Sequence, residues 1–307
     1  MSREVKNRKA SKQVDARLSE PLNSETPPTI GSTDLKPEYA TAALNMAADF
    51  VKQKQSLANM SILGHPLIVV FVWMVAIYFA APKVTIPTDN GNGSFINFIW
   101  QAFSKNKSVV PTVIFFGCLS TMIVFTLMSR VTETFFNSLS RDIIDTQGEN
   151  VFGVDLKKLA ERKCTSQELE QAKNTYIVVY RDTPVALVSL VENKILTTKD
   201  NLVMSVSTMG CRKVYEKSGI IEDLIDWCTI RTKQKYVQGD YTGKMKLLID
   251  VYSFDVDTKA ILKRKGFTLL KNAKVHESFI LGKLFGMKKE LWGLQFHFEK
   301  PKISEIK

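Results

Sequence analysis

Cysteine and histidine, the residues that most often bind metals or act as nucleophiles, are few and widely spaced in this chain. A zinc site or a disulfide framework needs cysteines or histidines paired at short, recurring intervals. The spacing here shows no such pairing, so we expect neither a metal nor a disulfide, and we identify no catalytic cluster. The residues concerned are Cys118, Cys164, Cys211, Cys228, His65, His276 and His297.

Two apolar segments contain no Asp, Glu, Lys or Arg. They are residues 62–81 and 109–128. A helix of about 20 residues rises about 30 Å, the thickness of the hydrocarbon core of a bilayer. We therefore predict two transmembrane helices, because the alternative, two buried helices of a soluble core, seldom lacks every charge over this length. Two helices without an internal carboxylate also argue against a channel or a transporter.

Small side chains recur in both predicted membrane helices. Helices in lipid approach each other closely where small residues meet. These residues are therefore candidates for contact with the helices of a membrane-protein client. The alternative is that they pack the two predicted helices against each other as a hairpin. They are Ala76, Ala80, Gly117, Ser120 and Thr121.

The chain is basic. Its 307 residues include 42 Lys and Arg and 31 Asp and Glu, for a net charge of +11. A basic surface suits an anionic cytosolic leaflet, which attracts each nearby basic residue by about 1 kcal/mol. Nucleic acid, the other usual partner, is not indicated, since the basic N-terminal tail lacks interleaved aromatic residues and no nucleic-acid-binding motif is present.

The segments around the hairpin are polar. Residues 1–33 predict a disordered cytosolic tail. Residues 34–56 predict an amphipathic helix, whose apolar stripe either packs on the protein, lies in the membrane interface or docks a partner. The stripe is Tyr39, Ala43, Met46 and Phe50.

The expected topology follows from the absence of an apolar run before residue 41. Without a signal peptide, both termini are expected in the cytosol and the loop 82–108 in the lumen. This loop contains two glycosylation sequons, at Asn92 and Asn106, which do not decide the compartment.

The remainder is expected to comprise a connecting helix and linker, residues 129–154, and a cytosolic α/β domain, residues 155–300. β-Branched runs and turn residues predict strands, and apolar periodicity predicts helices. The expected strands are 176–180, 185–192, 202–207, 246–252, 277–283 and 291–298, and the main expected helices are 219–233 and 258–265.

This domain resembles the GCN5-related N-acetyltransferase family. The likeness is strongest at Met204-Ser205-Val206-Ser207, at Ser218-Gly219-Ile220 and at Ile261 to Phe267. In that family a strand and the following loop bind acetyl-CoA, with backbone N–H groups at a helix N-terminus cradling the pyrophosphate. The resemblance implies an acetyl-CoA site at Ser207, Lys217, Ser218 and Gly219.

The sequence departs from the family pattern at the positions that matter most. Lys217 replaces the first loop glycine, which removes a permissive backbone, and Val214 replaces the leading Gln or Arg. The family's frequent proton-donating Tyr falls on Leu262, and a cofactor-facing Asn falls on Asp255. We therefore expect an acetyltransferase-like fold with no catalytic residue and no cofactor.

A second resemblance spans the chain. Residues 26–30, 35–38, 42–44 and 49–52 precede the two-helix hairpin and the α/β domain in a layout similar to the fungal inorganic phosphate transport proteins of the endoplasmic reticulum. That family implies an endoplasmic reticulum packaging chaperone for a polytopic high-affinity phosphate transporter. Vesicle coat components and the lipid bilayer are further implied partners. The alternative is a membrane-tethered N-acetyltransferase that uses acetyl-CoA.

Overall fold

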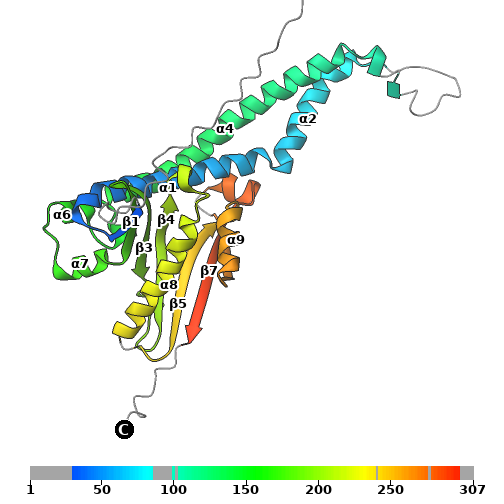
Figure 1. Cartoon of the computed structure of the whole chain (residues 1–307). Coiled ribbons are helices and arrows are strands. Elements are labelled where there is room, and N and C mark those ends of the chain that lie inside the picture. The colour runs from blue at the N-terminus through cyan, green and yellow to red at the C-terminus, as the bar shows by residue number, and fades with distance from the viewer. Residues whose placement is uncertain (1–29, 86–98, 101–102, 240, 276–277, 298–307) are drawn as a thin grey trace, which may run out of the picture.

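The computed structural model describes residues 30–85, 99–100, 103–239, 241–275 and 278–297. A seven-stranded sheet with helices on both faces is joined to two long helices that project away from it (Figure 1). Most of the predicted N-terminal tail and of the loop 82–108, with both ends of the chain, lies outside the described residues.

The sheet has the strand order β1-β2-β3-β4-β5-β7-β6. Neighbouring strands are antiparallel except β4 and β5, which are parallel. The strands are β1 (Ile30–Asp34), β2 (Thr175–Tyr180), β3 (Thr183–Glu192), β4 (Leu202–Cys211), β5 (Lys244–Tyr252), β6 (Thr268–Lys274) and β7 (Lys288–His297).

The helices fall into a hairpin unit and a sheet-covering set. The first comprises α1 (Ala40–Leu63), α2 (Pro66–Ala80) and α4 (Val109–Asp145), with the 3₁₀ turns η2 (Pro37–Tyr39) and η3 (Ala81–Lys83). The second comprises α5 (Glu149–Phe152), α6 (Leu156–Ala160), α7 (Ser166–Ala172), α8 (Ile220–Gln238) and α9 (Val256–Arg264), with η4 (Lys213–Tyr215) and the π-helical turn η5 (Ile280–Leu284).

The core has three parts. On one face of the sheet, α8 covers Ala186, Val188 and Leu190 of β3, and α9 lies beside α8. On the other face, α1, α5 and α6 cover Leu187. The third cluster lies at the base of the hairpin, between α1, α2 and α4. Because β3 is buried on both faces, it reads as an apolar run interrupted only by Ser189.

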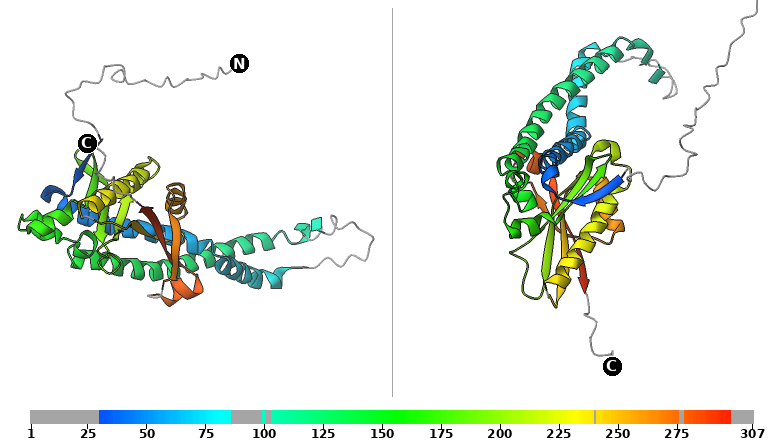
Figure 2. Two further views of the ribbon diagram at one scale, coloured as in Figure 1. Left: turned by 90° about the horizontal axis from the view of Figure 1, so that it is seen from below. Right: turned by 60° about the vertical axis from the view of Figure 1, so that its left-hand side comes forward.

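Helices α1 and α2 both pack along the long helix α4. The 37 residues of α4 span about 55 Å, with α1 against its C-terminal part and α2 against its N-terminal part (Figures 1 and 2). The helical conformation is interrupted between α1 and α2 at Gly64-His65-Pro66. Here Nδ1 of His65 accepts a hydrogen bond from the N–H of Leu67 (3.3 Å). Proline cannot continue a helix but suits its first turn.

Several expectations need correction. The helix expected at 34–56 begins at Ala40 and runs to Leu63. Ile62 and Leu63 of the expected apolar segment 62–81 therefore belong to α1, and α2 begins at Pro66 and ends at Ala80. The connecting helix expected after residue 128 needs no correction, since it continues the second apolar segment and residues 109–145 form one helix.

Two edge elements were not predicted, and one expected strand is wrong. Residues 30–33, assigned to the disordered tail, lie in β1 and pair with β2. Strand β6 was missed because almost all its side chains are exposed and no alternation marks it. The strand expected at 277–283 is replaced from Ile280 by η5, in which Gly282 approaches the backbone of Val275 too closely for any side chain.

The central pattern is confirmed. The β2–β3 hairpin turns at Arg181 and Asp182, both with positive φ (47° and 62°), as a two-residue turn between twisted strands requires. Strands β4, β5 and β7 and helices α8 and α9 also form where periodicity predicts them.

Candidate functional site

The parallel strands β4 and β5 part before they end. They are paired from Leu202 opposite Met245 to Val206 opposite Ile249. Beyond this point β4 continues beside β3, and β5 continues beside β7. A bulge accompanies the divergence, since Thr208 lies opposite Ser189 whereas Val206 lies opposite Leu190.

Ser207 is the extra residue of this bulge. Its hydroxyl lies within hydrogen-bonding distance of two backbone carbonyl oxygens, those of Val151 in α5 and of Ser189 in β3 (3.1 Å). The hydroxyl therefore ties α5 to the sheet, and this role occupies its only proton.

Helix α1 lies across the parted ends of the two strands. On β4, a Cβ at Gly210 would lie 2.5 Å from the ring of Phe50. On β5, the Nζ atom of Lys54 lies 6.0 Å from the centroid of the Tyr252 ring. Phe50 and Lys54 are one helical turn apart, so a single face of α1 bridges β4 and β5.

The loop before α8 keeps one feature of an anion-binding turn. Gly219 has φ = +84° and is the N-cap of α8, and its carbonyl accepts a hydrogen bond from the N–H of Glu222 (2.9 Å). Ser218 is adjacent, but its hydroxyl donates to the carbonyl of Tyr215 (2.5 Å). Lys217 is exposed beside them.

Acidic side chains follow in the first turn of α8. They are Glu222 and Asp223, and Glu222 forms an ion pair with Arg264 of α9 (2.6 Å). A negative charge at a helix N-terminus is favourable for the helix but repels a phosphate that approaches the same N–H groups. Lys217, Ser218 and Gly219 therefore lie beside two carboxylates, which would repel the phosphates of a nucleotide.

Two of the other three substituted positions, Leu262 and Asp255, have structural roles. Leu262 is fully buried between α9 and the sheet. Asp255 caps α9, since its carboxylate accepts a hydrogen bond from the N–H of Thr258 (3.1 Å). Neither side chain is available to transfer a proton to a substrate.

The buried thiols offer no reactive nucleophile. Burial raises the pKa of Cys211 to about 11, with a smaller contribution from Glu216, and burial raises the pKa of Cys228 further. The thiolate is the reactive form of cysteine, so both side chains are inert at neutral pH. Within the described ranges, no three His, Cys, Asp or Glu side chains gather in a metal-binding arrangement.

A small cavity that the sequence did not indicate lies at the opposite end of β4. It has a volume of about 260 Å³, and its walls include Glu192, Lys235 and Tyr241. Burial and the nearby Glu192 raise the pKa of Tyr241. Met204, the first residue of the strand motif noted in the sequence, also lines this cavity, but Ser207, Lys217, Ser218 and Gly219 do not.

The small residues of the hairpin divide into two groups. Ala76, Ala80 and Ser120 are buried, and α2 packs mainly on α4, so these residues lie in the seam between the two helices. Gly117 is different, because a Cβ there would meet nothing within 4 Å. The hydroxyl of Thr121 donates to the carbonyl of Gly117 (2.7 Å) on the same helix.

Aromatic residues also close this seam. The rings of Phe79 and Phe116 stack with their centroids 4.1 Å apart. Large apolar side chains on the outer surfaces of α2 and α4 are exposed, among them Trp73 (57%), Tyr78 (74%) and Phe115 (62%). The hairpin therefore has a packed interior and an apolar exterior.

Comparison with known families gives a match over most of the chain. Residues 12–296 match the family described as the inorganic phosphate transporter chaperone Pho86. The chain belongs to this family. Membership in the Pho86 family confirms the resemblance drawn from the N-terminal motifs and the hairpin layout, and it supports a role as a phosphate transporter chaperone. Comparison with curated proteins gives no match.

Solved structures similar to this Pho86-family chain are acetyltransferases. Naa50 of Arabidopsis thaliana, in complex with a bisubstrate analogue, is 15% identical over 40% of this chain and 72% of its own, with a TM-score of 0.32. A GNAT-family acetyltransferase of Streptococcus pneumoniae is 12% identical over 43% and 77%, with a TM-score of 0.32. The IAA acetyltransferase of Bacillus cereus is 12% identical over 43% and 85%, with a TM-score of 0.31. Likeness at this level does not bear on activity.

The stripe on the first helix is the feature whose role the sequence left open. Ala43, Met46 and Phe50 are buried against the sheet, with Tyr39 partly buried beside them. The stripe therefore packs on the protein, which was one of the alternatives. The signal was present in the helical spacing, but the sequence did not identify the surface it covers.

Proposed function

We propose that this chain is an accessory protein of the endoplasmic reticulum membrane that packages a phosphate transporter for exit, and so supports phosphate uptake. Membership in the chaperone family over residues 12–296 carries this proposal. The exposed apolar exterior of the hairpin supports it, since such a surface requires lipid or partner helices. The chaperone role is non-enzymatic, in keeping with the structural duties of Ser207, Leu262 and Asp255.

The proposed topology puts the sheet in the cytosol and the loop 82–108 in the lumen. The segment Pro66–Lys83 and the helix α4 are long and apolar enough to cross a membrane. Strand β1 precedes the hairpin and pairs with β2, which follows it. This pairing supports a common side for both flanks of the hairpin.

The proposed client contact is on α4 beside the seam, at the partly exposed residues Gly117 and Thr121. The space beside Gly117 admits a close-packed helix, which is how small residues promote association in lipid. Ala76, Ala80 and Ser120 would act indirectly, by holding α2 on α4. The client is a polytopic phosphate transporter, and vesicle coat components are further proposed partners.

The decisive experiment is deletion of the gene in its own host, followed by imaging of the tagged phosphate transporter. We expect the transporter to remain in the endoplasmic reticulum and phosphate uptake to fall. Normal arrival of the transporter at the cell surface would contradict the proposed function.

A substitution then tests the contact surface. Gly117→Leu fills the space beside the seam, where a Cβ meets nothing within 4 Å, so we expect transporter co-purification to fall while the protein remains folded. Cys118→Leu, at the next, exposed position of α4, is the matched control and should leave co-purification unchanged. Equal co-purification with both variants would move the contact away from Gly117.

A membrane-tethered acetyltransferase is the second candidate. The observation in its favour is the glycine-capped start of α8 after a bulged strand. Against it stand α1 across the strand ends and the carboxylates of Glu222 and Asp223. Calorimetry of the full chain in detergent with acetyl-CoA separates the two candidates. Binding tighter than about 100 μM, close to −5.5 kcal/mol, would favour the enzyme.

A further inference from the structure

The segment between β6 and β7, residues 278–287, combines exposed apolar side chains with basic ones. We propose that this segment binds the anionic headgroups of the membrane that holds the hairpin, with Phe279 and Leu284 in the bilayer interface. The inference rests on the proposed membrane location of α2 and α4, and it adds a second, peripheral contact between the protein and the lipid.

The segment is fixed to the base of the hairpin. Leu281 is fully buried, and it packs with Met287 in the cluster that includes Ile68 of α2 and Phe136 of α4. The N–H of Met287 donates to the carbonyl of Leu281 (2.9 Å). At Gly282, a Cβ would lie 1.8 Å from the carbonyl oxygen of Val275, so the segment is held tightly against the end of β6.

The segment 278–287 lies at the level along α2 and α4 where their apolar surface begins. The ring of Phe285 makes an edge-to-face contact with His65, with centroids 5.3 Å apart. His65 is the N-cap of α2, and every residue of α2 that follows is uncharged. On α4, the uncharged stretch ends just before Arg130. A segment at this level meets the headgroup region if α2 and α4 span the bilayer.

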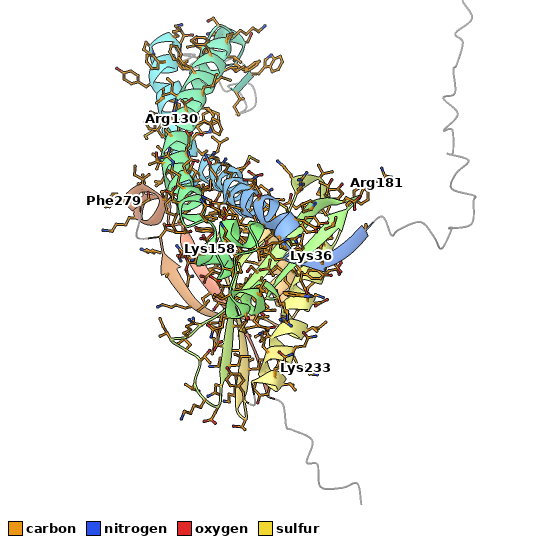
Figure 3. All side chains as sticks on the ribbon, turned by 90° about the vertical axis from the view of Figure 1, so that its left-hand side faces the viewer. Lys36, Arg130, Lys158, Arg181, Lys233 and Phe279 are labelled. Carbon is orange, nitrogen blue, oxygen red and sulfur yellow. The ribbon has the colours of Figure 1, made fainter. Side chains whose placement is uncertain are left out.

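The exposed side chains suit that environment. Phe279 is 70% exposed and Leu284 is 51% exposed, although the backbone between them is packed. Figure 3 shows Phe279 on the outside of the molecule, near the foot of the long helices. The Nζ atom of Lys283 lies 5.0 Å from the centroid of the Phe279 ring. An apolar group with an ammonium beside it is typical of segments that lie in a membrane interface.

The charge of the surrounding strands points to anionic lipid. The sequence from 268 to 289 contains five lysines and a single acidic residue, Glu277. Lys289 forms an ion pair with Asp250 (3.0 Å) on the neighbouring strand β5. The other lysines give this part of the sheet edge a positive charge, which a leaflet containing phosphatidylserine would attract. These lysines are Lys271, Lys274, Lys283 and Lys288.

Tryptophan fluorescence in vesicles tests the inference. The full chain carrying Phe279→Trp is reconstituted in phosphatidylcholine brominated near the headgroup, with and without phosphatidylserine. Ile195→Trp is the matched control, because Ile195 is 93% exposed in the loop before β4, at the other end of that strand from α1. We expect the emission added by Phe279→Trp to shift to the blue and to be quenched, more strongly with phosphatidylserine, and the emission added by Ile195→Trp to do neither.

The native tryptophan of α2 separates the possible failures. Trp73 is quenched if the hairpin is inserted in the bilayer. Loss of this quenched emission in Trp73→Phe would verify that it comes from Trp73. Quenching of Trp73 with an unquenched Phe279→Trp would overturn this inference alone, whereas an unquenched Trp73 would also overturn the membrane location. A Phe279→Trp emission that responds only when the transporter is co-purified would assign the segment to a protein partner and overturn the lipid contact.

A charge variant tests the role of the lysines. Lys283→Gln in the Phe279→Trp background should reduce the phosphatidylserine-dependent partition of the segment about fivefold. Lys194→Gln, an exposed lysine in the same loop as Ile195, is the control and should have no effect. An unchanged dependence on phosphatidylserine in Lys283→Gln would overturn the electrostatic part of the inference.

Discussion

The ring of Phe50 lies directly over Gly210, where α1 crosses the end of β4. The absence of a side chain on the strand lets the helix approach the sheet, and Phe50 is only 3% exposed in this position. Because α1 also packs along α4, this contact joins the sheet to the base of the hairpin. The same helix lies across the point where β4 and β5 separate. The helix that attaches the hairpin therefore also covers the gap between these two strands.

Gly210→Ala should therefore destabilise the protein. The added Cβ would lie 2.5 Å from the ring of Phe50, and overpacking of this kind costs about 1–3 kcal/mol. Thermal unfolding of the full chain in detergent measures the loss. The matched control is Gly31→Ala in β1, where a Cβ meets nothing within 4 Å and no loss is expected.

A second substitution tests whether the clash is with Phe50 itself. Phe50→Leu removes the ring and should lower the cost of Gly210→Ala, so the two changes will not be additive in a double-mutant cycle. Additive losses would show that another contact limits the approach of α1.

Lys54 should make stability depend on alkaline pH. Burial lowers the pKa of Lys54 from 10.5, although Asp255 opposes the shift. Between the lowered pKa and 10.5, the folded state binds fewer protons than the unfolded state, so the contribution of Lys54 to the free energy of unfolding rises with pH through this window. Below the lowered pKa, both states are protonated and the penalty for the buried charge is fully present.

Lys54→Met isolates this contribution. The difference in free energy of unfolding, wild type minus variant, should increase with pH across the window, and a difference independent of pH would contradict the burial of the charge. Taking the difference removes groups of opposite effect, such as Tyr241, whose raised pKa makes stability fall with pH. Lys52→Met, an exposed lysine on the same helix, should retain the alkaline rise.

The buried thiols predict selective alkylation. A pKa of about 11 in place of 9.0 leaves about a hundredfold less thiolate at Cys211 at pH 8, and burial further restricts access. Native protein treated with iodoacetamide should be modified at the partly exposed Cys164 before Cys211 and Cys228. Mass spectrometry of the peptides measures this order, and unfolding in urea should remove it. Rapid native modification of Cys228 would show that α8 opens from the sheet.

The central strands and helices could be predicted because their side chains alternate or repeat with the period of the element they form. Strands β2 and β3 carry apolar runs around the Arg181-Asp182 turn, and α8 has an apolar face. Strands β1 and β6 lie at the two edges of the sheet and are mostly exposed, so backbone pairing rather than side-chain pattern determines them.

The candidate sites were predictable only in part. The substitutions at Lys217, Leu262 and Asp255 indicated from the sequence that the acetyl-CoA motifs are incomplete. The position of α1 was not predictable in the same way, because the contact of Phe50 with Gly210 joins residues far apart in the chain. Likewise, the sequence identified a set of small side chains in the two apolar helices. The packing of α2 on α4 was needed to show that Ala76, Ala80 and Ser120 lie in the seam, whereas Gly117 and Thr121 lie beside it.

The division between the seam and the residues beside it predicts opposite results for two leucine substitutions. Ala80 is 4% exposed between α2 and α4, so Ala80→Leu should overpack the hairpin, separate the stacked rings of Phe79 and Phe116, and cost about 1–3 kcal/mol. Gly117→Leu enters open space and should leave the thermal unfolding of the free protein almost unchanged, even where it blocks the client. Hydrogen exchange of α2 in detergent provides a second measurement, since opening of the seam exposes its backbone amides. Equal destabilisation by the two variants would mean that Gly117 also faces a packed helix.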